Sequence, residues 1–229
     1  MGRKALYVEI SADGMVAENE YIPFSSDIFS DDFDFGEIKR IEKANSSVIV
    51  ANTRKTAIRV ADISHIADFS KKNYDRWNLI ENNFPIGDRM NENTHVFDGC
   101  VFNGDNGQSR FFMTALPVSA CDVLAKIGVQ LTGSIHRVAR IDTIEHVLFE
   151  RYVEETEEDE SVLIFHPQDN GIRILHIENK LPNAAHYISN HPAHRENEFH
   201  RFYNSIKKPE IKTRAIYLGE NMDFADFLL

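Results

Sequence analysis

The stretch VLIFHPQDNGIRILHIENKL, residues 162–181, decides the fold that the sequence predicts. Residues 162–165 are apolar, and the apolar pattern returns at residues 172–177 after a turn, which is typical of a β-hairpin. A second strand–turn–strand pattern spans Leu6–Ile22, where Asp13-Gly14 is a dipeptide that closes hairpins. Helical patterns separate the two hairpins, so the sequence predicts an α/β or α+β protein.

The residues between the hairpins predict further elements. We expect antiparallel strands at 94–102 and 110–116, and then a helix from Val118 that ends at Gly128 as its C-cap. A strand is expected at 129–137.

Length and composition exclude several classes of protein. The chain has 229 residues, 42% of them apolar and 27% charged, which is typical of a folded protein. Two cysteines are too few for a disulfide framework, and the net charge of −11 argues against a broad nucleic-acid surface. No apolar run reaches the roughly 18 residues that a membrane helix needs. We therefore expect a cytoplasmic protein with no nucleic-acid partner and no membrane insertion.

The order of these elements resembles the actin-like nucleotide-binding fold, in the form found in PilM of type IV pilus assembly and in the cytoplasmic part of GspL of type II secretion. In that family a strand leads to a helix that ends in glycine, and then to a strand and the helix that joins the two halves. The corresponding segments here are 110–117, 118–128 and 129–152, followed by the 162–181 hairpin and a closing strand and turn at 215–222.

The resemblance implies two RNase H-like, actin-like lobes in a compact and degenerate form. Residues 1–150 would form the N-terminal lobe, with a small inserted subdomain at about 94–137, and residues 151–229 would form a shortened C-terminal lobe. Each hairpin would lie in one of two similar five-stranded sheets. The chain after the second hairpin is too short for the extra subdomain that PilM carries there.

The same resemblance places two nucleotide-binding turns on unsuitable residues. The first phosphate turn falls on Glu9, Ser11 and Asp13, where the family has an aspartate and a glycine-rich turn. The adenine turn falls on Gly219 and Glu220, and a carboxylate at that position would repel a triphosphate.

The second phosphate turn is altered as well. It falls on His166, Gln168 and Asp169, and Pro167 between them has no N–H to offer a phosphate. The sequence contains no G-x-x-x-x-G-K-[ST] and no G-x-G-x-x-G motif. We therefore expect no bound cofactor, as in a pseudo-ATPase.

Two metal sites are alternatives. Imidazoles are zinc ligands, and one stretch has four of them: His186, His191, His194 and His200. No cysteine joins this stretch, and a polar loop explains it as well. Glu9, Asp13 and Asp169 would be the ligands of two Mg²⁺ ions in a nuclease-like relative, but the sequence predicts no basic groove for its substrate.

Two acidic stretches stand out. Phenylalanines alternate with aspartates near residues 29–35, and two interpretations stay open: the rings cap the domain, or Asp31, Phe33 and Phe35 bind a partner. The second stretch, Glu154–Glu160, has six carboxylates in seven residues and predicts a solvated loop, with contact to a basic partner segment as the alternative.

An interaction protein is the expected function. By resemblance, the chain would be a non-catalytic scaffold of a pilus or secretion assembly that binds the cytoplasmic tail of a membrane-anchored protein. The acidic charge favours a basic partner segment, and such flanks are rich in Lys and Arg. The protein would lie in the cytoplasm, free or peripherally held at the inner face of the membrane, as a monomer or a homodimer. The alternative is an ATPase or a sugar-kinase-like phosphotransferase with unusual phosphate loops.

Overall fold

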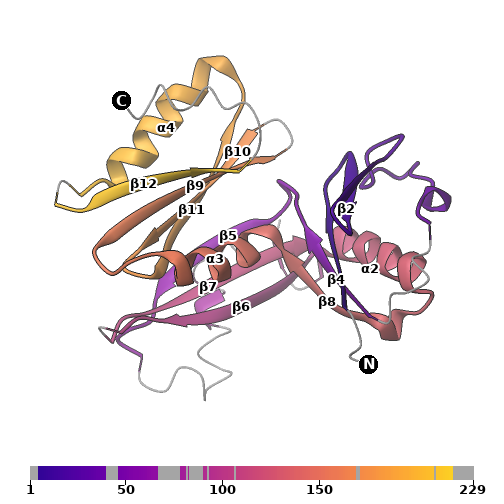
Figure 1. Cartoon of the computed structure of the whole chain (residues 1–229), viewed down its shortest axis with the longest axis horizontal. Coiled ribbons are helices and arrows are strands. Elements are labelled where there is room, and N and C mark those ends of the chain that lie inside the picture. The colour runs from indigo at the N-terminus through magenta and orange to yellow at the C-terminus, as the bar shows by residue number, and fades with distance from the viewer. Residues whose placement is uncertain are drawn as a thin grey trace. The chain divides into compact units, whose positions relative to one another are not determined.

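The computed structural model in Figure 1 shows a chain that divides into two compact units. It describes residues 5–39, 46–66, 78–80, 82, 90–91, 93–105, 107–168, 171–208 and 210–218. Unit 1 comprises Met1–Ile58, Trp77–Gly99 and Met113–Leu148, and unit 2 comprises Arg59–Arg76, Cys100–Phe112 and Phe149–Leu229. Four elements have residues in both units: β5 (Ala57–Asp62), β6 (His95–Asn103), β7 (Ser109–Pro117) and α3 (Ile144–Glu155).

A five-stranded sheet of order β3-β2-β1-β4-β8 forms the centre of unit 1. Its strands are β1 (Ala5–Ile10), β2 (Gly14–Ala17), β3 (Glu20–Pro23), β4 (Ser46–Ala51) and β8 (Val138–Thr143). The first three strands form an antiparallel meander, while β4 runs parallel to both β1 and β8. The hairpin predicted at the N-terminus is therefore present, with its return segment divided into two strands.

Unit 2 repeats the arrangement of the first four strands. Its sheet has the order β11-β10-β9-β12, with an antiparallel meander and a parallel strand beside the first one. The strands are β9 (Glu160–Gln168), β10 (Gly171–Glu178), β11 (Leu181–Ser189) and β12 (Lys212–Tyr217). A third sheet has the order β5-β7-β6, with β5 at Ala57–Asp62.

The two meanders also share a turn. Glu18 and Asn19 between β2 and β3 both have positive φ, of 53° and 68°, and Asn179 and Lys180 between β10 and β11 have φ of 53° and 58°. Positive φ at both central residues defines the type I′ turn, whose twist suits a two-residue hairpin. The second and third strands of both meanders are therefore joined by the same type of turn.

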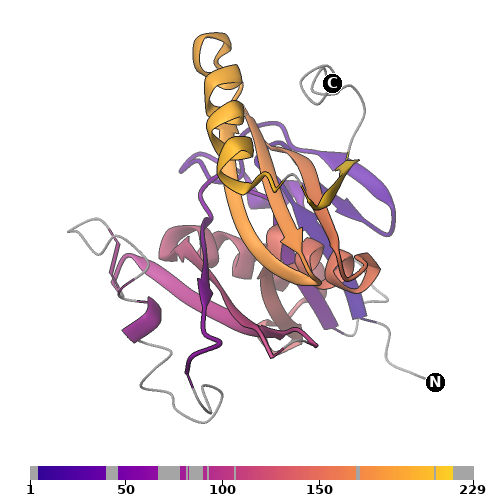
Figure 2. The ribbon, with the colours of Figure 1, turned by 90° about the vertical axis from the view of Figure 1, so that its left-hand side faces the viewer.

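One helix covers the core face of each main sheet. In unit 1, α2 (Val118–Thr132) lies against β4 and β8 and buries Leu124, Ile127 and Leu131 (Figure 1). In unit 2, α4 (Pro192–Ile206) lies along β11 and buries Phe199 and Phe202 (Figure 2). Each such side chain contributes about 1.5–3 kcal/mol through burial. No helix within the described residues is long and apolar enough to cross a membrane.

Three predictions of local structure were wrong. The second sheet has four strands among the residues that the structure describes, because no strand equivalent to β8 is added to it. The first hairpin turns over residues 11–14, where Ser11 N–H donates to Gly14 O, and not at Asp13-Gly14 alone. The helix from Val118 continues past Gly128.

The true end of α2 is Gly133, with φ of 78° and an N–H that donates to Val129 O over 2.7 Å. Residues 129–132 are helical because Leu131 follows Ile127 on the buried face. A 3₁₀ turn, η3 at Ile135–Arg137, then leads into β8, so no strand covers 129–137.

Gly128 has a packing role inside the helix. A Cβ atom added there would lie 2.5 Å from Val138 Cγ2 and 3.5 Å from Ile49 Cγ1. The close approach of α2 to β4 and β8 therefore depends on the missing side chain.

We expect Gly128→Ala to lower the free energy of unfolding by about 1–3 kcal/mol, since an extra methyl group overpacks this contact. In a Val138→Ala background the same change should be neutral or stabilising, because alanine is favoured over glycine in helices by about 1 kcal/mol. Urea unfolding of the four proteins measures this coupling. An equal loss in both backgrounds would contradict the packing role.

Candidate functional site

The turn of the first hairpin is closed by its own groups. Ser11 N–H donates to Gly14 O over 2.9 Å, and the Ser11 hydroxyl lies 2.7 Å from Asp13 Oδ1. A phosphate-binding turn directs backbone N–H groups at the anion. Here the Ser11 N–H is already used, and the exposed Asp13 adds a negative charge. The turn is therefore poorly suited to a phosphate.

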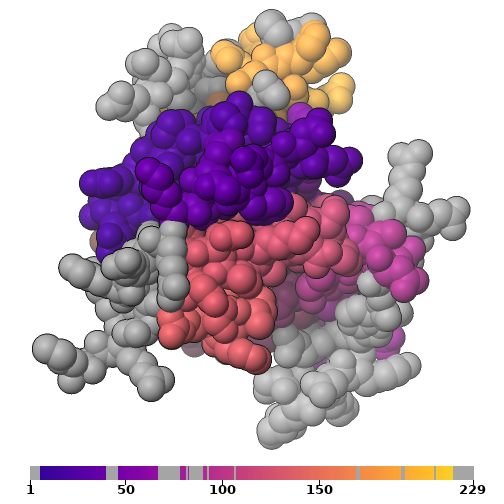
Figure 3. All heavy atoms as spheres, turned by 90° about the vertical axis from the view of Figure 1, so that its right-hand side faces the viewer, coloured from indigo at the N-terminus to yellow at the C-terminus, as the bar shows by residue number. Residues whose placement is uncertain are grey.

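The backbone carbonyls of this turn hold the segment that follows β3. Phe24 N–H donates to Asp13 O over 2.8 Å, and Ile28 N–H donates to Ala12 O over 3.0 Å. We refer to residues 24–38 as the acidic cap. Its apolar side chains enter the core of unit 1, and its four aspartates stay in solvent. Figure 3 shows the indigo N-terminal residues directly against coral residues that come from much later in the chain.

Hydrogen bonds to its own carboxylates shape the acidic cap. Asp27 Oδ1 accepts from Phe29 N–H over 2.8 Å, and Asp34 Oδ1 accepts from Gly36 N–H over 2.8 Å. Both are local turns in which an aspartate replaces a backbone acceptor. The carboxylates therefore define the course of the cap as well as its charge.

The three residues proposed for partner binding differ in position. Phe33 is buried in the core and packs edge-on against Phe35, with ring centroids 5.1 Å apart. Phe35 is half-buried, with Lys126 Nζ 5.6 Å from its ring centroid. Asp31 is exposed. Of the two interpretations, Phe33 has the capping role, and Asp31 is the member that a partner would meet.

Glu9 lies on the sheet face opposite to the core. It is half-buried on β1, and its Oε1 accepts a hydrogen bond of 2.7 Å from Asn52 Nδ2, just beyond β4. The parallel pairing of β1 with β4 brings the two together, because Ile10 pairs with Ala51. Glu9 is thus oriented by a neutral amide.

In the second hairpin, the residues predicted to form the phosphate turn lie in a strand and not in a loop. His166, Pro167 and Gln168 all belong to β9, and Gln168 pairs with Gly171. Asp169 lies outside the described residues, as do Gly219 and Glu220 of the closing turn. A Cβ atom at Gly171 would be 2.4 Å from Ile188 O, so β10 and β11 approach closely here.

His166 is held neutral. Burial is the main cause that lowers its pKa to about 4, and the charge of Arg173, its cross-strand partner, contributes to the same shift. Arg173 is itself buried, with its guanidinium 5.4 Å from the Tyr187 ring centroid. A row of three side chains therefore crosses β9, β10 and β11, and only one of them is charged.

A buried serine–histidine contact was not predicted. His176 lies 2.9 Å from Ser161 Oγ through Nε2 and 3.0 Å from Asn183 Nδ2 through Nδ1. An amide nitrogen only donates, so Nδ1 accepts and Nε2 carries the proton that goes to Ser161. That tautomer cannot remove a proton from the hydroxyl. Because all the contacts are cross-strand, their sequence separation of 7 and 15 residues gave no local signal.

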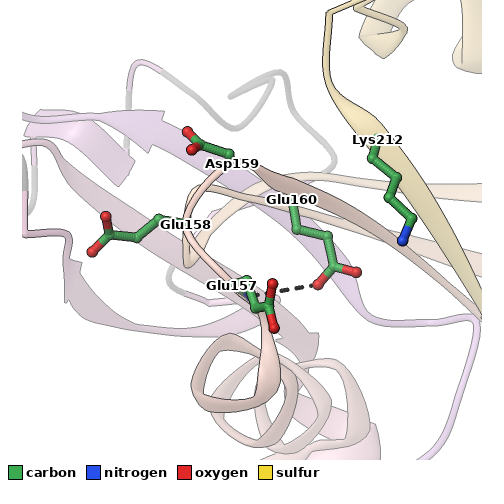
Figure 4. A pocket seen from close by; sticks show the side chains of 5 residues that line it. All are labelled: Glu157, Glu158, Asp159, Glu160 and Lys212. Carbon is green, nitrogen blue, oxygen red and sulfur yellow. Dashed lines mark hydrogen bonds between the residues drawn. The ribbon is translucent and has the colours of Figure 1, made fainter.

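The acidic loop after α3 surrounds a hollow of about 300 Å³. It is lined by Glu157, Glu158, Asp159, Glu160 and Lys212, as Figure 4 shows. Glu160 forms an ion pair of 2.8 Å with Arg214. Burial alone would raise the pKa of Glu160, but the hydrogen bond from Arg214 holds it below the usual range. The charge of Glu160 is therefore compensated within the chain.

The zinc alternative finds no support among the described residues. The Mg²⁺ alternative includes Asp169, which lies outside those residues, so it stays a prediction. Within the described ranges, no group of three His, Cys, Asp or Glu side chains is placed to hold a metal ion. His186 stacks on Phe202 with centroids 5.3 Å apart, His191 stacks on His194, and His200 lies 3.7 Å from Glu196 Oε1. Apart from the His191–His194 pair, these histidines contact different side chains and do not converge on one point.

Stability should fall on acidification, because His166 and His176 both have a pKa of about 4 in the folded chain against 6.5 when unfolded. Burial is the main cause for both. Between pH 6.5 and pH 4 the unfolded chain binds protons at these histidines and the folded chain does not. The free energy of unfolding is therefore highest above pH 6.5, declines toward pH 4 and levels off below it. Each histidine accounts for at most about 3 kcal/mol.

Urea unfolding between pH 7 and pH 4.5 measures this decline. His166→Gln and His176→Gln should each make it shallower, while His136→Gln, at an exposed position, is the control. An unchanged slope in both buried variants would contradict the assignment.

Comparison with known proteins shows likeness at the level of structure. No protein-family model matches the sequence, and no curated protein does. A Bacteroides thetaiotaomicron protein with an actin-like ATPase fold and unknown function superimposes with a TM-score of 0.59 at 9% identity, over 99% of this chain and 86% of that one. A chain of a PilM–PilN type IV pilus biogenesis complex gives a TM-score of 0.58 at 14% identity, over 89% and 67%.

A third structure is less similar. The cytoplasmic domain of EpsL, an inner-membrane component of the Vibrio cholerae type II secretion system, gives a TM-score of 0.48 at 10% identity, over 95% of this chain and 83% of that one. The first two likenesses extend over most of the chain, and the repeated strand order of units 1 and 2 agrees with them. The chain therefore has the actin-like fold.

Proposed function

We propose that this protein is a non-catalytic actin-like scaffold that binds a basic cytoplasmic segment of a membrane-anchored protein in a pilus or secretion assembly. The observation that carries the proposal is the charge of the N-terminal part of unit 1. Residues 5–38 contain nine carboxylates and no Lys or Arg: Glu9, Asp13, Glu18, Glu20, Asp27, Asp31, Asp32, Asp34 and Glu37. Such a surface attracts a basic segment and repels an acidic one.

The backbone of the acidic cap holds part of this negative charge at fixed positions. Its backbone is fixed by the hydrogen bonds of Phe24 and Ile28 to the first hairpin, and its rings are packed in the core. Asp31, Asp32 and Asp34 remain exposed between those rings. A partner would therefore meet carboxylates on an ordered backbone, which loses less conformational entropy on binding than a flexible acidic tail.

Nucleotide chemistry is a weaker interpretation of the same fold. The Ser11 N–H already donates to Gly14 O inside the turn, so it is not available to a phosphate. The carboxylates of Asp13 and Glu9 would repel a phosphate group. In the second hairpin His166 is buried and neutral, and Pro167 has no N–H. These features support a pseudo-ATPase over the alternative, an ATPase or sugar-kinase-like phosphotransferase.

The cellular location that we propose is based on the membrane-anchored partner. One of the similar structures is a PilM–PilN type IV pilus biogenesis complex. By analogy with the pilus context of that complex, the protein would act in the cytoplasm and be held peripherally at the inner face of the membrane by its partner. Basic flanks are typical of the cytoplasmic side of membrane-spanning proteins.

We expect Mg²⁺ with ATP, ADP or GTP at 1 mM to leave the melting temperature unchanged, and calorimetry to show no binding tighter than about 1 mM, since Ser11 and Pro167 offer no N–H to a phosphate. A ligand at a hundred times its dissociation constant would stabilise the protein by about 2.7 kcal/mol. A micromolar dissociation constant would support the phosphotransferase instead.

We expect a Lys- and Arg-rich juxtamembrane peptide, taken from a membrane protein encoded beside the gene, to bind with an affinity that falls as salt rises from 50 to 500 mM. The combined change Asp31→Asn, Asp32→Asn, Asp34→Asn should weaken binding about tenfold, a loss of about 1.4 kcal/mol.

The matched control neutralises three carboxylates in the other acidic stretch: Glu157→Gln, Glu158→Gln, Asp159→Asn. It should retain the affinity of the unmodified protein, because that loop is not part of the acidic cap. Salt-insensitive binding, or equal losses in both triple variants, would refute a specific electrostatic role for the cap.

A further inference from the structure

Two aromatic rings of the acidic cap each carry a lysine of the same chain. Lys55 Nζ lies 4.8 Å from the centroid of the Phe29 ring, and Lys126 Nζ lies 5.6 Å from the centroid of the Phe35 ring. Both distances are within the roughly 6 Å at which the face of a ring attracts a cation. We refer to these two ring faces as the cation sites.

Each cation site has one side in the core and one side toward solvent. Phe29 and Phe35 are half-buried and pack against the core of unit 1, and the Phe35 ring meets Phe33 edge to face with centroids 5.1 Å apart. Lys55 and Lys126 are exposed. The lysines therefore occupy the solvent side of rings whose position is set by the core.

Both lysines extend from ordered backbone. Lys126 belongs to α2, and the Lys55 N–H donates to Thr53 Oγ1 over 3.2 Å in the turn that follows β4. A group tethered beside its binding site has a high effective concentration there. An incoming cation would have to displace the lysine before it could stack on the ring.

Carboxylates lie next to both rings but do not hold the lysines. Asp27 stands two residues before Phe29, and Asp34 directly precedes Phe35; both aspartates are exposed. Among the residues that the structure describes, neither lysine lies within ion-pair distance of an Asp or Glu. A basic side chain can bind to a ring face and to a carboxylate, and the cap has both groups side by side in the chain.

We propose that the cation sites on Phe29 and Phe35 receive two basic side chains of the partner segment, preferably arginines, and that Lys55 and Lys126 are intramolecular competitors for the same sites. This inference rests on the proposed function, because it names the groups on the acidic cap that the basic segment contacts. Arginine is preferred because its planar guanidinium stacks on a ring and also donates to a neighbouring carboxylate. A segment that cannot stack would leave the lysines in place and bind by charge alone.

A synthetic peptide of alternating Arg and Ser is a suitable probe. Lys55→Gln and Lys126→Gln should each tighten its binding about two- to fivefold, since the ring face is then vacant. The matched controls are Lys39→Gln and Arg54→Gln. They remove the same charge beside the cap or beside Lys55, from exposed side chains that contact no ring in the described part of the chain, and should tighten binding less.

A double-mutant cycle separates the ring from the charge. Phe35→Leu keeps an apolar side chain in the core and removes the ring face, so in that background Lys126→Gln should tighten binding no more than Lys39→Gln does. A peptide of alternating Lys and Ser has the same charge as the Arg–Ser peptide and should bind the unmodified protein more weakly. This preference for arginine should narrow in Phe35→Leu.

One measurement on the unmodified protein keeps the outcome decisive even if Phe35→Leu folds poorly. The ε-methylene protons of Lys126 lie over the Phe35 ring, whose ring current shields them, and saturating Arg–Ser peptide should move their resonances to the unstacked position. Equal gains in the stacking and control variants, or unmoved Lys126 resonances, would overturn the cation sites. If the Asp31, Asp32, Asp34 triple variant still binds more weakly, the proposed function stays intact; no binding by the unmodified protein would overturn both.

Discussion

The alternation of side chains along β1 is the constraint on which unit 1 depends. Parallel pairing with β4 over Ala5–Ile10 fixes the strand, so Leu6, Val8 and Ile10 must face one side and Tyr7 and Glu9 the other. A slip of one residue would exchange the two faces and expose the core. The buried face thus dictates which side chains lie on the opposite face of β1, and both follow from a single register.

The acidic cap covers part of the core face of the same sheet. It occupies the position between β3 and the parallel strand β4, and it buries Ile28, Phe33 and Ile38 without a long helix. Carboxylates between the rings stay hydrated, and two of them replace backbone acceptors in tight turns. The same segment therefore supplies both surface charge and core packing. A change of the surface that alters the backbone of this segment would also disturb the core.

What the sequence could predict was local. Both hairpins and the strands around residues 103–109 follow from apolar runs and turn residues close in the chain. The role of Gly128 could not be predicted, because its reason is Val138 on another element. In the same way the alternation of Phe and Asp near residue 31 left capping and binding open, since the capping role of Phe33 follows only from its tertiary contacts, and partner binding stays a prediction.

The two units show how one strand order can carry different chemistry. Each meander joins its second and third strands by a type I′ turn and pairs its first strand with a parallel neighbour. In unit 1 the polar groups near the first hairpin are exposed carboxylates, whereas in unit 2 the corresponding strand holds buried His166 opposite Arg173. The shared strand order therefore fixes the backbone of the two meanders, while the side chains on it leave unit 1 with exposed charge and unit 2 with a buried polar row.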